Sequence, residues 1–218
     1  MININYSDQK EKTITLLQRL YKDLEKLNNG RKSINSVTPE RLWWEIFNKI
    51  FTILITCENC LNSKDSLVSH LIARYTYEIL IISEYVFGDD KNIQEKTEKF
   101  LSFNQFQNPE RKWTKVDYNQ MIESTPDSVL SSSHKGHYRL LCNYAHPSMD
   151  SFMLNRRGEK SEYLVTINTV LLTIASILEI VKICFEKSDY FNSKEKELFD
   201  IDALSEETYS LMEELENK

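Results

Sequence analysis

Arg139 and His146 are the residues whose types and spacing best suit chemistry on a phosphodiester. They lie seven positions apart in the segment YRLLCNYAHPS, Tyr138 to Ser148. Seven residues are close to two turns of α-helix, so both side chains would project from one face. Chemistry on a phosphodiester needs at least a fixed cation beside a group that titrates near neutral pH. Because Pro147 disfavours helical geometry before it, His146 is expected in the last turn, where the helix dipole favours imidazolium.

The surroundings of this pair are basic and aromatic. Residues 131–160 hold five Lys and Arg against two acidic residues, a local balance of 5 − 2 = +3. Tyrosine rings there can stack on unpaired bases, which favours single-stranded RNA over a duplex. The alternative is that these residues form only a polar surface around the end of a helix. The residues expected to bind RNA are Lys135, Tyr138, Tyr144, Arg156 and Arg157.

The negative charge of the chain is concentrated at its C-terminal end. The formal net charge is −6, and residues 194–218 alone, with three lysines and nine acids, give 3 − 9 = −6. The overall balance argues against nonspecific nucleic-acid binding by bulk charge, but it leaves room for a local cationic site. The tail is expected to be a solvated helix; a partner segment and an electrostatic screen over the site are the alternatives.

The rest of the sequence predicts an all-α protein. Only four Gly and four Pro occur, too few for many hairpins, whereas apolar residues recur at helical spacing. We expect a multi-helix bundle of long antiparallel helices with an acidic C-terminal helix. The expected division is an N-terminal helix and linker (1–37), the bundle (38–190) and the acidic tail (191–218). Long helices are predicted at about 7–27, 39–62, 66–87, 93–106, 134–146 and 162–188.

The most apolar segment, 164–185, contains Asn168, Glu179 and Lys182. These side chains are costly in a bilayer, so a buried core helix is the better interpretation and no membrane partner is expected. The N-terminus lacks the basic residues followed by an apolar run that are typical of a signal peptide. The four cysteines are expected to be reduced thiols. The expected location is the cytoplasm.

Arg74 and Glu78 are a polar pair, four residues apart, in the otherwise apolar helix 66–87. Such a pair can bridge one turn of its own helix or reach a neighbouring helix. One interpretation is a partly buried ion pair that fixes packing. The other places it beside His146, where it would orient that imidazole or tune its pKa.

A helical bundle with an arginine, six intervening residues and a histidine on a late helix resembles the HEPN superfamily (higher eukaryotes and prokaryotes nucleotide-binding). The Arg74/Glu78 pair followed by YRLLCNYAHPS also resembles an uncharacterised bacterial family associated with defence genes. The resemblance covers roughly residues 40–190. It implies a metal-independent endoribonuclease without a cofactor, often a toxin or an abortive-infection effector against phage.

By this resemblance, His146 would be the general acid or base and Arg139 would hold the scissile phosphate. The active site would be composite, formed where two protomers of a homodimer meet. Substrates would be single-stranded RNA or tRNA, and an inhibitor or antitoxin is an expected partner. Family nucleases often have a small polar residue after the arginine, where this chain has Leu140. Asn143 is placed to take over that polar role.

Two alternative functions are a non-catalytic binding module and a metal-binding protein. A helical module that binds nucleic acid or protein without catalysis would share most of these features. Metal binding would use His134, His137, Cys142 and His146, or Cys57 and Cys60. Cys142 lies five residues after His137, out of alignment on a helix, and Cys57 and Cys60 lie in an apolar helix where cysteine is usually a small core residue. No metal or cofactor is therefore expected.

Overall fold

The computed structural model shows a bundle of helices. Within the residues that the structure describes, every regular element is a helix. The described residues are 6–29, 31–32, 34, 36–88, 92–101, 121, 141 and 159–216. The helices are α1 (Tyr6–Asn28), α2 (Pro39–Ser63), α3 (Ser66–Phe87), α4 (Ile93–Leu101), α8 (Glu159–Lys187), α9 (Ser193–Glu197) and α10 (Ile201–Glu216). The expected all-α class is confirmed.

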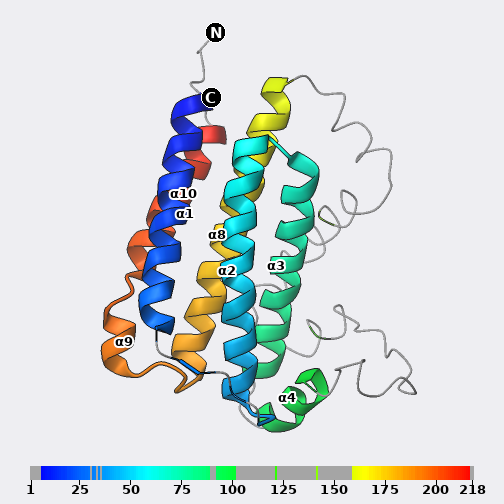
Figure 1. The fold of residues 1–218 in the computed structure, drawn as a ribbon, viewed down its shortest axis with the longest axis vertical. Helices are drawn as coiled ribbons and strands as arrows, with labels where there is room; N and C mark the ends of the chain where they lie inside the picture. The colour runs from blue at the N-terminus through cyan, green and yellow to red at the C-terminus, as the bar shows by residue number, and fades with distance from the viewer. Residues whose placement is uncertain are drawn as a thin grey trace, which may run out of the picture.

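The long helices run alongside one another in two directions. Figure 1 shows α1, α3 and α8 running downwards, and α2 and α10 running upwards. Helices consecutive in the chain, such as α2 and α3, therefore lie antiparallel. By contrast α3 and α8, which pack closely, run in the same direction. A parallel pair needs a long connection between its members, and residues 88–158 provide it.

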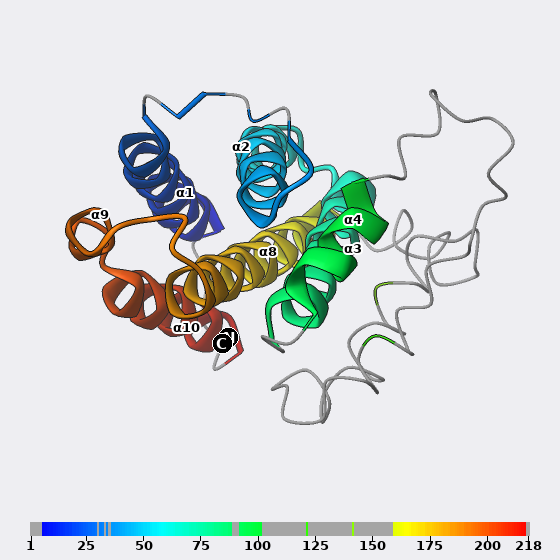
Figure 2. The same cartoon turned by 90° about the horizontal axis from the view of Figure 1, so that it is seen from below.

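Helix α8 is the central element of the bundle. Seen along the bundle, it lies between α1, α2, α3 and α10 (Figure 2), and it packs against all four. Ile167, Leu171, Ile174 and Ile180 are each 0% exposed and Ile183 is 8% exposed, so α8 is buried on more than one side. Its apolar stretch, Glu162–Lys187, is long enough to cross a membrane by length and composition, and most of it is buried among the other helices.

Local signals fix where the central helices begin and end. Thr38 caps α2, its Oγ1 accepting from the amide of Arg41 at 3.4 Å, and Pro39 occupies the first turn. Lys64 ends α2 in the left-handed conformation, with φ of 60°. Asp65 then caps α3 by accepting from the amide of Val68 at 2.9 Å. The two helices thus reverse direction within two residues.

The acidic C-terminal segment packs on the bundle through α10. Leu204, Thr208, Leu211 and Leu215 are buried at successive turns, so α10 presents one apolar face. Acidic side chains beside that face pair with α1: Arg19 contacts Glu207 at 2.8 Å, and Lys12 contacts Glu214 at 3.1 Å. Described residues from all three expected segments, 1–37, 38–190 and 191–218, contribute to one hydrophobic core.

Candidate functional site

Arg74 and Glu78 form an ion pair on α3. Arg74 Nε donates to Glu78 Oε1 at 3.0 Å, and the side chains are 25% and 16% exposed respectively. Because both keep some contact with water, such a pair within one helix contributes only a few tenths of a kcal/mol. Its position at the surface of α3 is therefore of more interest than its contribution to stability.

The other predicted site residues lie outside the described residues. This applies to Arg139, His146 and Asn143 of the expected chemistry, and to all of the expected RNA contacts. The latter are Lys135, Tyr138, Tyr144, Arg156 and Arg157. The candidate zinc ligands His134, His137, Cys142 and His146 lie outside them too.

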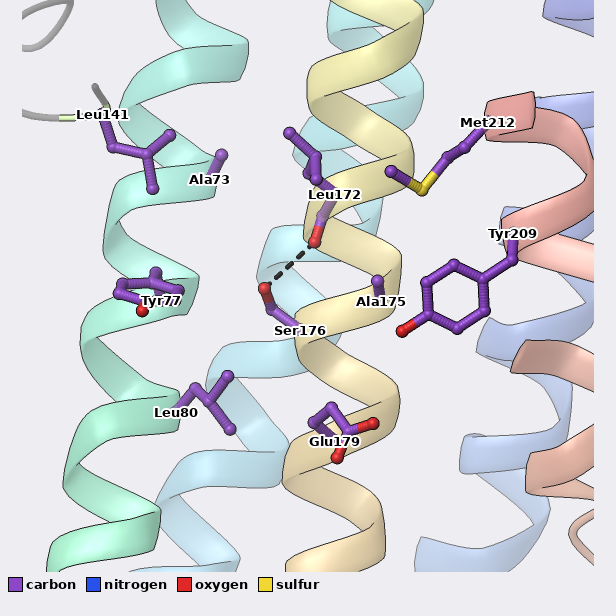
Figure 3. Close-up of a pocket in the computed structure, with 10 residues that line it drawn as sticks. All are labelled: Ala73, Tyr77, Leu80, Leu141, Leu172, Ala175, Ser176, Glu179, Tyr209 and Met212. Atoms are coloured by element: carbon purple, nitrogen blue, oxygen red, sulfur yellow. Dashed lines mark hydrogen bonds between the residues drawn. The ribbon is translucent and has the colours of Figure 1, made fainter. Parts of the chain in front are cut away.

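Leu141 is the residue of the Arg139–His146 segment that the structure describes. Leu141 has helical backbone and is 9% exposed. It lines one pocket together with Ala73 and Tyr77 of α3 (Figure 3), directly beside Arg74 in the sequence.

His70 completes a polar row on α3 that sequence reasoning missed. It precedes Arg74 by four residues, as Arg74 precedes Glu78, so the three share one side of the helix. His70 is 6% exposed, and its Nδ1 lies 2.7 Å from the carbonyl oxygen of Ser66. Burial lowers the pKa of His70, although the Ser66 hydrogen bond opposes this. The repeated spacing of four was the signal that could have revealed it.

An exposed apolar row borders the same ion pair. Leu67, Leu71 and Tyr75 are 40%, 42% and 41% exposed. They also recur every four residues on α3, so they share a side of the helix with Arg74 and Glu78. Large apolar side chains gathered on one helix face commonly mark a contact surface for another protein.

A pocket of about 300 Å³ lies over α8, between α3 and α10. Figure 3 shows Tyr77 on the α3 side and Tyr209 extending from α10 toward α8. Among the described lining residues, Glu179 is the charged one. Burial, together with the negative charge of Glu179, raises the pKa of nearby Glu84, although Lys187 opposes the shift. The described lining residues are Ala73, Tyr77, Leu80, Leu141, Leu172, Ala175, Ser176, Glu179, Tyr209 and Met212.

The described cysteines are poorly suited to metal binding. Cys57 and Cys60 are buried in α2, and Cys184 is buried in α8. Burial raises the pKa of each thiol, that of Cys60 to about 11 and that of Cys184 to about 12. The thiolate is the form that binds metals, so these residues are core side chains. Across the described ranges, no three His, Cys, Asp or Glu residues gather as metal ligands.

Comparison with known proteins adds no relative. No family model matches the chain, and neither does any curated protein or solved structure.

Proposed function

We propose that this protein is a metal-independent endoribonuclease of HEPN type, acting on single-stranded RNA or tRNA. It would serve as a cytoplasmic toxin or anti-phage effector, restrained by an inhibitor until needed. The supporting observations are an all-α bundle and the basic, aromatic segment around Arg139 and His146. The observation that carries most weight is that Leu141, which lies between Arg139 and His146 in the sequence, lines one pocket with Ala73 and Tyr77 of α3, the helix that also carries Arg74 and Glu78.

The proposed mechanism uses side chains only. His146 takes the proton of the ribose 2′-hydroxyl, whose oxygen then attacks the adjacent phosphorus. Arg139 holds the phosphate and stabilises the negative charge that develops on it, and Asn143 supplies a further polar contact. The 5′-oxygen of the next nucleotide leaves with the proton that His146 accepted, which yields a 2′,3′-cyclic phosphate and a free 5′-hydroxyl. In this scheme the Arg74–Glu78 pair positions the Arg139–His146 segment.

The same proposal includes a homodimer formed through α3. The exposed row of Leu67, Leu71 and Tyr75 supplies apolar area for it. Arg74 and Glu78, four residues apart, are self-complementary about a two-fold axis. When two α3 helices cross antiparallel, each Arg74 lies opposite Glu78 of the partner subunit, as an isologous interface requires. This arrangement would bring the two Arg139–His146 segments to neighbouring positions.

The dimer predicts a clear effect of Leu71→Asp. The substitution places an unpaired carboxylate in the centre of the apolar row, so the dimer dissociation constant should rise at least about 100-fold. Sedimentation equilibrium over a range of protein concentrations measures it. Leu198→Asp is the matched control, because Leu198 is 73% exposed and lies away from α3. A wild-type protein that stays monomeric throughout, or equal weakening by both variants, would remove the interface from the proposal.

The activity itself is tested by incubating the wild-type protein with single-stranded RNA and with tRNA in excess EDTA. We expect cleavage in EDTA, with 2′,3′-cyclic phosphate at the new 3′ ends and free hydroxyls at the 5′ ends. EDTA would inhibit a metal-dependent contaminating nuclease but not the proposed activity. The chemistry of the product ends is a second way to tell the two apart. Cleavage that appears only with added Mg²⁺ or Mn²⁺ would contradict the proposal.

The second candidate is a helical binding module without catalysis. Leu140, at the position where family nucleases often carry a small polar residue, favours it. RNA binding without any cleavage, in EDTA or with metal, would support this second function.

A further inference from the structure

We propose that the pocket over α8 binds a small organic cation: an aromatic or alkyl primary amine whose ammonium group pairs with Glu179. The site lies between α3, α8 and α10, and none of its described lining residues is proposed to act in RNA cleavage, although Leu141 belongs to the same segment as Arg139 and His146. The inference does not rest on the proposed ribonuclease activity, because its test measures the binding of a small amine.

The charge of the pocket selects a cation. Glu179 makes no hydrogen bond or ion pair within the described part of the chain. None of the described lining residues is basic. The nearby Glu84 feels the negative charge of Glu179, which together with burial raises the pKa of Glu84. An ammonium group would relieve this repulsion, whereas a second anion would add to it.

The walls select an apolar body for that cation. Leu80, Leu141, Leu172 and Met212 line the space above a floor that includes Ala175 (Figure 3). Tyr77 and Tyr209 line it from opposite sides, where their rings can face a flat group or the cation itself. The volume of about 300 Å³ is at the lower end of the range for ligand pockets, roughly 300–1,000 Å³, which limits the ligand to about one or two rings.

Among the described lining residues, Glu179 is the charged anchor for a ligand. The hydroxyl of Ser176 donates to the carbonyl oxygen of Leu172 at 3.0 Å, the dashed line in Figure 3, and so is already satisfied. Glu179 is the described lining residue that carries a negative charge to pair with a charged donor. A protonated primary amine carries three N–H donors and can reach this carboxylate while its apolar body stays among the leucines.

The test uses tryptamine as the probe and indole-3-propionate as its anionic counterpart. Both carry an indole ring on a two-carbon chain, so they differ in the charge of the terminal group. By isothermal titration calorimetry with the full chain, tryptamine should bind saturably, with a dissociation constant on the order of 1 mM or lower. Indole-3-propionate should bind at least about tenfold more weakly.

Two variants connect the binding to this pocket. Glu179→Gln should weaken the binding of tryptamine about tenfold. Glu162→Gln changes a carboxyl on the same helix away from the pocket, so it should leave the dissociation constant of tryptamine unchanged. Tyr209→Ala removes one wall at a side chain that is 52% exposed, so it should weaken binding without unfolding the protein. No saturable binding of tryptamine, equal binding of the two indoles, or binding unaffected by Glu179→Gln and Tyr209→Ala would each overturn the proposal.

Discussion

Replacing His146 by alanine is expected to lower the rate of RNA cleavage at least about 100-fold, since a positioned general acid or base contributes roughly 10²–10⁴-fold. Arg139→Ala should have an effect of similar size, because the developing charge on the phosphate would lose its cation. Arg139→Lys should lower the rate less than Arg139→Ala does, because it keeps the charge but loses the bidentate geometry of guanidinium. Single-turnover cleavage of a labelled RNA in EDTA measures all three.

His137→Ala is the matched control for His146→Ala. It removes the same side chain from the same stretch of sequence, nine positions earlier. The control should cleave at close to the wild-type rate, and all variants should keep the helical circular dichroism of the parent. Wild-type cleavage by the His146 variant would end its catalytic assignment. If both histidine variants lost the same amount of cleavage activity, the loss would come from a disturbed fold of the segment and would not support a catalytic role for His146.

The helices were predictable because their signals are local. Thr38 followed by Pro39 is a helix start, and the structure has the cap and the first turn where these residues place them. Asp65 likewise caps α3, as its position before an apolar run indicates. Such signals depend on hydrogen bonds between residues three or four apart, so they can be read in the sequence without knowing the fold.

The relations between distant helices were not predictable in the same way. Neither α3 nor α8 alone indicates that the two helices lie side by side in the same direction, since that depends on residues at least 159 − 87 = 72 positions apart. The Arg74–Glu78 pair was foreseeable from its spacing. The pocket that Leu141 lines together with Tyr77 was not foreseeable, because tertiary contacts have no periodic signature.

Trp43→Ala is expected to destabilise the protein more than any other change considered, by about 3–5 kcal/mol. Trp43 is 0% exposed, and its ring stacks on Phe87 with centroids 4.2 Å apart and an interplanar angle of 19°. The contact joins the first half of α2 to the end of α3. Loss of the indole leaves a cavity between them, and the free energy of unfolding in urea should fall accordingly.

Trp43→Phe should cost clearly less than Trp43→Ala. The phenyl ring keeps the stacking on Phe87, and the indole N–H that it removes makes no hydrogen bond within the described residues, although it is buried. Trp44→Ala is the matched control, since Trp44 lies one position along α2 and is only half-buried. A Phe variant as unstable as the Ala variant would mean that the indole N–H has a partner. If Trp44→Ala lowered the free energy of unfolding more than Trp43→Ala does, the main contact of α2 would lie on the other side of that helix.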